Sequence, residues 1–348
     1  MDTIFAPLCG LSLGSVQIIR VSGDKSKKIL KKIIKSSEEV IANPRKLFLR
    51  EIKNSNQVID EALIVFFNSP NSYTGEDVIE INIHASSVIE KELYEFLSKH
   101  GARAAEPGEF TKRAYLNGQL DLVQAEAVAD LINSKTKEQA RLAKQQLTGK
   151  LSSLVDSVAE PLRDFLAIIE AHIDFPEEGI EEQTFNQWKE VIAPISKKLK
   201  SLLATYSSGR ITKEGAQVVL CGIPNVGKSS LLNALAKEDR AIVTEIAGTT
   251  TDSIEQLINL NGYVVSLWDT AGLEDEFAQK ARKVEKIEKL GIEKSWERVR
   301  QSDLVLFVLD LTQELDSQLK LLEKVKSISE VLVPVSYTHL TLPTIYSV

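Results

Sequence analysis

The first 118 residues combine strand-like and helix-like patterns of apolar and polar positions. Three segments have the length and composition of strands: 15–21, 61–67 and 78–83. The last of these alternates, with Glu80 and Asn82 on its polar face. Residues 87–99 predict a helix that ends at Gly101. The sequence therefore predicts an α+β domain over residues 1–118.

Beyond this region the apolar residues repeat at three- and four-residue steps. Two such stripes are typical of helices with one buried face: 151–169 and 188–203. Pro161 predicts a kink or a restart within the first stripe. The serine and glycine residues of 207–210 predict a linker. We therefore expect the first half of a helical domain over residues 119–210.

From Gly215 onward, strand-like and helix-like segments alternate along the chain. The predicted strands are 218–221, 263–268, 304–309 and 331–335. This alternation favours a parallel sheet covered by helices on both faces. The whole pattern predicts an α/β multi-domain protein whose third domain spans residues 211–335.

Composition narrows the class of protein. The chain has 348 residues, of which 43% are hydrophobic and 26% charged, the balance of a soluble globular protein with two or three domains. It has two cysteines, too few for a disulfide framework. No apolar stretch approaches the roughly 18 residues of a membrane span, and the first residues do not resemble a signal peptide. We expect a cytoplasmic protein that does not contact a membrane.

The net charge of −7 argues against a protein that binds nucleic acid by charge alone. One segment is an exception, because six lysines lie close together in it: Lys25, Lys27, Lys28, Lys31, Lys32 and Lys35. Isoleucine and leucine residues are interleaved with them at helical spacing. Two interpretations remain open: a solvated helix face with an apolar underside, or a contact with RNA phosphates.

Residues Gly222–Ser229 have the spacing of a phosphate-binding loop between a strand and a helix. In such a loop, backbone N–H groups converge on phosphate oxygens at the positive end of the helix. Lys228 is expected to reach the β- and γ-phosphates, and the Ser229 hydroxyl to bind Mg²⁺. The predicted nucleotide contacts from this segment are Asn225, Val226, Gly227, Lys228, Ser229 and Ser230.

Two further segments complete the predicted nucleotide site. Asp269-Thr270-Ala271-Gly272 follows a strand, so that Asp269 can hold the metal through water and Gly272 can contact the γ-phosphate. A switch loop lies between the first helix and that strand, with these predicted contacts: Thr244, Glu245, Ile246, Ala247, Gly248, Thr249 and Thr250. Thr250 is the expected second hydroxyl on Mg²⁺. The three segments in this order predict a translation-factor-type GTPase.

The residue after Gly272 is Leu273, which cannot orient water as the glutamine of many GTPases does. A monovalent cation could supply the missing positive charge. Asn225 would give it a side-chain oxygen and the switch loop further oxygens. The alternative for Asn225 is a hydrogen bond that stabilises the loop.

Five segments resemble one family, the tRNA-modification GTPases MnmE, also called TrmE. They are Gln17–Gly23, Pro70–Asp77, Glu106–Thr111, Leu120–Ala127 and Asp174–Pro176. The resemblance implies an N-terminal folate-binding-type domain, a helical middle domain and a Ras-like P-loop GTPase domain. It also implies a homodimer, a tetrahydrofolate one-carbon donor, and GTPase domains that pair in a K⁺-dependent way. With the flavoprotein MnmG (GidA), such proteins modify C5 of the wobble uridine, U34, of certain tRNAs.

The resemblance also implies roles for individual residues. The K⁺ ligands would be Asn225, Thr244, Ile246 and Thr249, and the Mg²⁺ ligands Ser229 and Thr250. Glu288 matches the glutamate that orients water, although Glu285 is an equally placed competitor. The folate contacts would be Arg20, Glu80 and Gln119, where Gln119 stands in place of a usual basic residue. Glu80 could alternatively be a polar-face strand residue.

The last 13 residues, 336–348, lack the Asn-Lys-x-Asp loop that reads the guanine edge. We expect a GTPase domain truncated before this motif, with residues 336–348 as a non-native tail, weakened guanine selectivity and no tRNA modification by the chain alone. The two helical stripes would then lack partners, which predicts poor solubility. Two other functions are also compatible with the sequence: a ribosome-assembly-type GTPase switch with an N-terminal docking domain, and a folate-dependent one-carbon transferase regulated by the GTPase.

Overall fold

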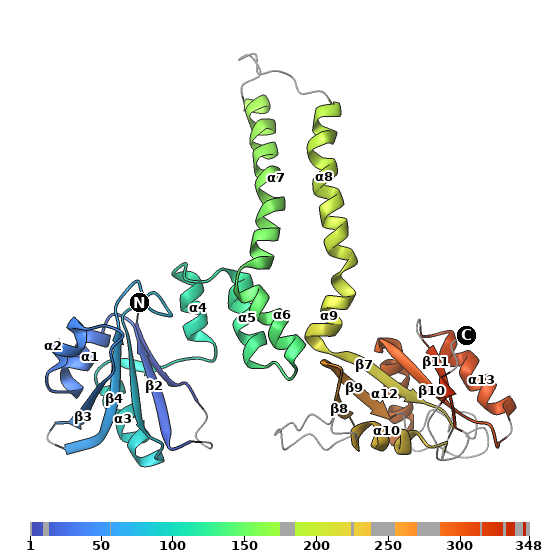
Figure 1. Cartoon of the computed structure of the whole chain (residues 1–348), viewed down its shortest axis with the longest axis horizontal. Helices are drawn as coiled ribbons and strands as arrows, with labels where there is room; N and C mark the ends of the chain where they lie inside the picture. The colour runs from blue at the N-terminus through green and yellow to red at the C-terminus, as the bar shows by residue number, and fades with distance from the viewer. Residues whose placement is uncertain are drawn as a thin grey trace. The chain divides into compact units, whose positions relative to one another are not determined.

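The computed structural model describes residues 2–9, 14–55, 57–174, 185–223, 226–237, 255–269, 286–313, 315–329, 332–337 and 344–345 (Figure 1). Contacts divide the chain into two units. The first consists of Met1–Ala129 with Gln146–Ser152, and the second of Asp130–Gln145 with Ser153–Val348.

Within the described residues, the first unit is built on a six-stranded sheet of order β3-β4-β5-β2-β1-β6. Its strands are β1 (Thr3–Pro7), β2 (Val16–Ser22), β3 (Phe48–Asn54), β4 (Gln57–Phe67), β5 (Val78–His84) and β6 (Ala102–Ala104). All neighbours are antiparallel except β1 and β6. The three strands predicted from the sequence are confirmed as β2, β4 and β5, with β4 extended to Gln57.

Three helices pack on one face of this sheet: α1 (Ser26–Ile33), α2 (Ser37–Ala42) and α3 (Ser87–Lys99). The bounds of α3 confirm the predicted helix. Alternation along β2 places Ile19 and Val21 in the core with Leu30 and Leu93, and directs Arg20 to the opposite face. Figure 1 shows α1 and α2 on one side of the sheet and α4 (Glu109–Leu116) on the other. Helix α5 (Leu122–Ile132) follows.

The helical segments are α6 (Lys137–Leu147), α7 (Lys150–Asp174), α8 (Phe185–Ala204) and α9 (Tyr206–Glu214). Both predicted stripes are therefore helices, and α7 continues through Pro161 without a restart. The predicted linker at 207–210 is wrong, because these residues lie within α9. Arg210 in α9 is ion-paired with Asp303, a contact that local composition does not reveal. Among the described residues, no helix is long and apolar enough to cross a membrane.

A second sheet of six strands, counted over the described residues, has the order β12-β11-β10-β7-β9-β8. Its strands are β7 (Ala216–Cys221), β8 (Glu255–Leu260), β9 (Tyr263–Asp269), β10 (Leu304–Asp310), β11 (Leu332–Tyr337) and β12 (Thr344–Ile345). The four central strands are parallel, but β8 and β12 are antiparallel to their neighbours. The prediction of a parallel sheet is therefore wrong at both edges. Strand β8 returns into β9 through Asn261 and Gly262, which both have positive φ and form a hairpin turn.

Helices cover both faces of the second sheet, as predicted. They are α10 (Lys228–Lys237), α12 (Lys286–Gln301) and α13 (Leu315–Lys326). Leu231 and Leu232 of α10 pack with Val218 and Leu220 on one face. Residues of α12 and α13 pack with Val219 and Phe307 on the other. Strand β11 continues to Tyr337, two residues into the segment expected to be a tail.

Candidate functional site

The phosphate-binding loop begins where β7 ends in the centre of the second sheet. Gly222 has φ of +145°, and a Cβ at this position would clash with the carbonyl oxygen of Val308 in β10. A side chain therefore cannot replace the glycine without moving the backbone. Val226, 5% exposed, anchors the other side of the loop in the core beside α10. The loop is thus fixed against the sheet at both of its ends.

Lys228 is the first residue of α10, and its ammonium group turns back over the loop. Its Nζ donates hydrogen bonds to the carbonyl oxygens of Gly222, at 2.7 Å, and Ile223, at 2.8 Å. The helix is joined to the loop by a bond from the Leu231 N–H to the Gly227 carbonyl, 2.9 Å. A positive charge and the N-terminal end of a helix therefore lie at the same place, as an anion site requires.

Ser229 and Ser230 follow in the first turn of α10, and both are exposed. Asp269 is the last residue of β9, and its backbone pairs with Leu220 at the edge of the sheet where the loop begins. The structure therefore brings the start of the Asp-Thr-Ala-Gly segment to the same edge as Lys228. In sheets of parallel strands, ligands bind at the edge formed by the carboxyl ends of the strands, which is the edge described here.

The remaining predicted nucleotide contacts lie outside the described residues. They are Asn225, Thr244, Glu245, Ile246, Ala247, Gly248, Thr249, Thr250, Thr270, Ala271 and Gly272. The backbone of Glu288 lies in the first turn of α12. Its competitor, Glu285, lies outside the described residues.

The hydroxyl oxygen at this loop suits Mg²⁺. Across the described residues there is no group of three His, Cys, Asp or Glu side chains that could hold a metal ion. Mg²⁺ is commonly bound by one or two protein oxygens together with substrate phosphates, and the Ser229 hydroxyl beside the loop is such an oxygen.

A second candidate site lies on the face of the first sheet opposite α1, α2 and α3. Arg20 of β2 and Glu80 of β5 are register partners. The Arg20 guanidinium donates two hydrogen bonds to Oε1 of Glu80, at 2.9 and 2.7 Å. Both side chains are partly exposed, at 17% and 19%. Two of the three residues predicted to bind folate are therefore paired with each other and partly exposed.

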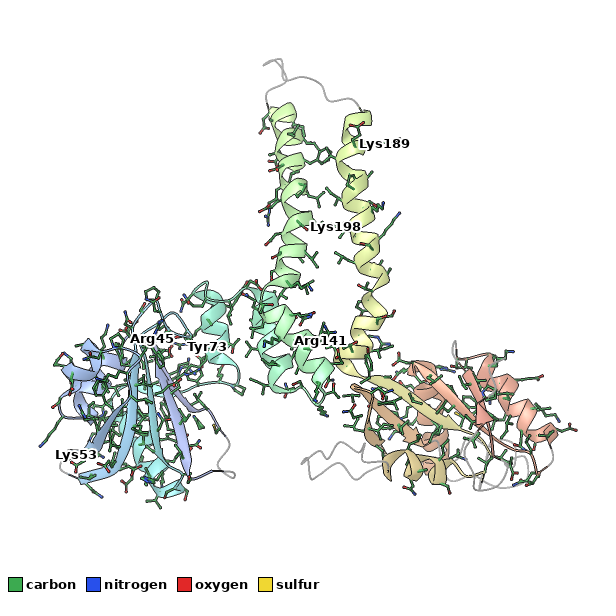
Figure 2. All side chains as sticks on the ribbon, viewed as in Figure 1. Arg45, Lys53, Tyr73, Arg141, Lys189 and Lys198 are labelled. Carbon is green, nitrogen blue, oxygen red and sulfur yellow. The ribbon has the colours of Figure 1, made fainter. Side chains whose placement is uncertain are left out.

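Two aromatic side chains that the sequence analysis did not single out complete this second site. The Arg20 guanidinium lies 5.0 Å from the ring centre of Tyr73 and 5.4 Å from that of Phe110. Tyr73, labelled in Figure 2, is hydrogen-bonded to the Thr111 hydroxyl at 2.8 Å. Both aromatic residues fall within segments that carry the family resemblance, which was the available signal. Such rings can stack on a planar ligand.

Gln119, the third predicted folate contact, lies beside the loop that carries Tyr73. A Cβ added to Gly75 would be 3.2 Å from the Gln119 Cγ atom. Asn117 fixes this loop from the same side by donating to the Thr74 carbonyl at 2.7 Å. The three predicted residues thus belong to one side of the first unit, with Arg20 and Glu80 in direct contact and Gln119 at the loop.

An ion cluster around the buried Arg113 side chain joins this loop to α4. Arg113, of which 5% of the side chain is exposed, bonds to Asp2, Glu76 and Glu109. Glu76 also accepts a hydrogen bond from the Ser22 hydroxyl at 2.6 Å, which joins the loop to β2. Arg103 bonds to Glu109 at 2.6 Å and, as the largest cause, holds the Glu109 pKa down at about 2. The ion pair between Arg113 and Glu76 thus helps to hold the loop that carries Tyr73.

Two protein-family models match consecutive parts of the chain. Residues 3–119 match the family model of the GTP-binding protein TrmE N-terminus, and residues 122–336 match that of the MnmE helical domain. The tRNA modification GTPase MnmE of Natranaerobius thermophilus is 42% identical over 320 residues, which cover 91% of this chain and 68% of that protein.

Other relatives give the same result. The tRNA modification GTPase MnmE of Clostridioides difficile is 43% identical over 93% of this chain and 70% of its own length. The protein of that name from Alkaliphilus metalliredigens is 42% identical over 98% of this chain and 73% of its own length. Among solved structures, the G domain of the T. maritima FeoB iron transporter is 28% identical over 35% of this chain and 70% of that chain, with a TM-score of 0.25, too low to support an argument.

Proposed function

The chain belongs to the tRNA modification GTPase MnmE family, and from this premise we propose that it couples K⁺-activated GTP hydrolysis to modification at C5 of the wobble uridine, U34, of tRNA. The observation that carries the proposal is the phosphate loop at the end of β7, over which the Lys228 ammonium turns back. A strand, a glycine-bounded loop and a helix in this arrangement suit a nucleoside triphosphate.

Hydrolysis requires water to attack the γ-phosphorus while the bond to the β–γ bridging oxygen breaks, giving GDP and phosphate. Lys228 would neutralise charge on the β- and γ-phosphates. Ser229 and Thr250 would hold Mg²⁺, which supplies a further positive charge when bound. Glu288 would orient the attacking water, because Leu273 in the usual glutamine position cannot.

The charge that develops on the leaving oxygen needs one more positive partner. We propose that K⁺ takes this role, held by oxygens of Asn225, Thr244, Ile246 and Thr249. The GTPase domains of a homodimer would pair around it. In this arrangement K⁺ acts where other GTPases place an arginine, whose contribution is about 10³–10⁵ in rate.

The test is the rate of GTP hydrolysis in K⁺ and in Na⁺ at equal ionic strength. We expect the rate in K⁺ to be at least about tenfold higher. An Asn225→Ala variant should lose the difference while keeping GTP binding, because a cation ligand is removed and Lys228 is not. Equal rates in both salts would contradict the role of K⁺ and favour an ordinary GTPase switch.

The N-terminal domain would supply the carbon that is transferred. We propose that a tetrahydrofolate derivative binds beside Arg20, Glu80 and Gln119, with Tyr73 or Phe110 against its planar ring. A guanidinium and a carboxylate with free lone pairs suit a pterin and a glutamate tail. The flavoprotein MnmG (GidA) and tRNA would complete the complex in the cytoplasm.

Folate binding can be measured by titration with 5-formyltetrahydrofolate. Arg20→Ala should weaken binding by about tenfold or more, since it removes a charged partner and leaves Glu80 unpaired. Arg50→Ala is the matched control, because Arg50 lies on β3 in an ion pair with Glu39 and away from the site. Unchanged binding by Arg20→Ala would contradict the assigned contact. Absence of folate binding by the parent chain would favour the alternative function, a ribosome-assembly-type switch in which the N-terminal domain serves for docking.

A further inference from the structure

The lysines of α1 and its flanks have no role in either candidate site. Residues 24–35 contain six lysines and one aspartate, although the chain as a whole has a net charge of −7. Helix α1 lies on the face of the first sheet opposite Arg20 and Glu80. This strongly basic segment therefore needs a separate explanation.

The lysines project from a helix that is rigidly held. Ile29, Leu30 and Ile33 on its inner side are 0–1% exposed and belong to the main core of the first unit. Three lysines on its outer side, Lys28, Lys31 and Lys32, are exposed, as is Lys35 just beyond the end of the helix; we call these four the α1 lysine row. Side chains three and four positions apart on a helix are neighbours, about 5–6 Å apart at Cβ. The lysines of the row therefore form a fixed cluster of positive charges.

Neighbouring carboxylates neutralise only part of this row. Glu38 pairs with Lys31 at 2.7 Å, but Glu39 pairs with Arg50 and Glu51 with Lys53. Within the part of the chain that the structure describes, Lys28 and Lys32 have no ion pair. Like charges at this spacing oppose helix formation. The row costs some stability and adds nothing to the core.

We propose that the α1 lysine row binds the phosphate backbone of the tRNA substrate. Positive charges spread over a helix and the residue that follows it match an extended polyanion rather than a small anion, which needs donors that converge on one point. The residues between the lysines are buried and cannot stack on bases, so the contact reads no sequence. This inference rests on the tRNA part of the proposed function and names the surface of this chain that the tRNA would contact.

An anionic membrane is the other polyanionic partner that a basic helix could bind. A helix that lies on a membrane also inserts large apolar side chains. Between residues 17 and 46, all of which the structure describes, no large apolar side chain is exposed. The α1 lysine row therefore fits RNA better than lipid.

The test compares the full chain with a Lys28→Gln/Lys32→Gln variant. Binding of unfractionated bacterial tRNA is measured across a KCl series. The control is Lys197→Gln/Lys200→Gln, the same loss of charge from exposed positions of α8. Vesicles of phosphatidylglycerol and phosphatidylcholine are the membrane probe, and GTP hydrolysis is measured separately.

We expect the α1 variant to bind tRNA about tenfold more weakly at low salt, with a salt slope shallower by about 1.4–1.8, and the control to bind as the parent does. GTP hydrolysis by the α1 variant should equal that of the parent. Equal tRNA binding by both variants would overturn the inference and leave the proposed function intact. If the parent chain hydrolyses GTP but binds no tRNA, the inference fails together with the tRNA partner. Preferential loss of vesicle binding would also overturn it.

Discussion

Lys228 is the residue on which the nucleotide site depends most directly. Its ammonium bonds to two carbonyl oxygens of the loop that it closes, Gly222 and Ile223. Phosphate oxygens carry more negative charge than carbonyl oxygens, so the same ammonium can exchange these partners for a triphosphate. The lysine is therefore already positioned at the loop before any phosphate contact is made.

We predict that Lys228→Ala lowers the rate of GTP hydrolysis by about 10²–10³, the usual effect of removing one preorganised charge from a developing negative charge. Hydrolysis under single-turnover conditions and binding of a fluorescent GTP analogue are the measurements. Lys320→Ala, at an exposed position of α13, is the control and should hydrolyse GTP at the parent rate. A parental rate in Lys228→Ala would contradict the assignment of this loop.

Glu109 gives a prediction for the pH dependence of stability. The hydrogen bond from Arg103 is the main cause that lowers its pKa from 4.5 to about 2. A carboxyl whose pKa is lower in the folded state stabilises the fold above its unfolded pKa. That stabilisation is lost as the pH falls from about 4.5 towards about 2. The first unit should therefore lose stability in this acidic range.

Glu109→Gln should lower the free energy of unfolding at neutral pH by about 1–3 kcal/mol and flatten its dependence on pH in that range. The three tryptophans all lie beyond residue 187, so hydrogen exchange of peptides from β2 and β5 is the suitable measurement. Glu51→Gln is the control, because the Glu51 side chain is 57% exposed and its ion pair is worth little. An unchanged pH profile in Glu109→Gln would refute this role.

At the scale of elements, the junction between α9 and the second sheet depends on Asp303. Its side chain pairs with Arg210 of α9 and accepts a bond from the Gln217 N–H of β7 at 2.8 Å. The Asp303 N–H in turn donates to the Gln217 carbonyl at 2.8 Å. The Gln217 side chain accepts from the Trp268 indole at 2.8 Å. One carboxylate thus joins a helix and the central strand.

Asp303→Ala should destabilise this part of the chain by about 1–3 kcal/mol, because it leaves a backbone N–H and a guanidinium without their acceptor. Urea unfolding followed by tryptophan fluorescence will report it, since Trp268 belongs to the same network. The double variant Arg210→Ala/Asp303→Ala should cost less than the sum of the single changes. Additive effects would show that the two side chains are not coupled. Glu323→Gln, exposed on α13, is the control.

The sequence predicts most of the helices and central strands, because long stripes and buried apolar runs carry a strong periodic signal. It does not reveal β3, where Arg50, Glu51 and Lys53 interrupt the apolar positions of an edge strand. It also fails at α9, where serine and glycine predict a linker but the contact of Arg210 with Asp303 supports a helix. At α9 a tertiary contact outweighs the local composition. At β3 the charged residues obscure the strand pattern.

The sequence predicts one candidate site better than the other, because only the first is continuous in sequence. The phosphate loop is continuous in sequence, so its spacing alone predicts its place between β7 and α10. The contact of Arg20 with Glu80, in contrast, joins residues 60 positions apart and depends on the register of β2 and β5. Tyr73 lies on the loop that Glu76 joins to Arg113, whereas Phe110 lies with Arg113 on α4.

At the scale of the whole molecule, the apolar surface of the helical segment is the property with the largest consequence. Large apolar side chains are exposed along α7 and α8: Val155, Leu166 and Ile173 on α7, and Leu199 and Leu203 on α8. Leu203 is 73% exposed and Ile173 70%. Exposed apolar side chains in this number promote association. The chain should therefore form species larger than the proposed dimer as its concentration rises.

The variant Leu199→Lys/Leu203→Lys tests this directly. Because both side chains are exposed, the substitution should leave the free energy of unfolding within about 0.5 kcal/mol of the parent. Sedimentation velocity over a concentration series should show that the larger species decrease while a dimer persists, since the variant alters only α8. Binding of a hydrophobic dye should fall in parallel. If instead the variant unfolds or associates as strongly as the parent, these leucines are packed in solution and the exposed stripe is not the cause of association.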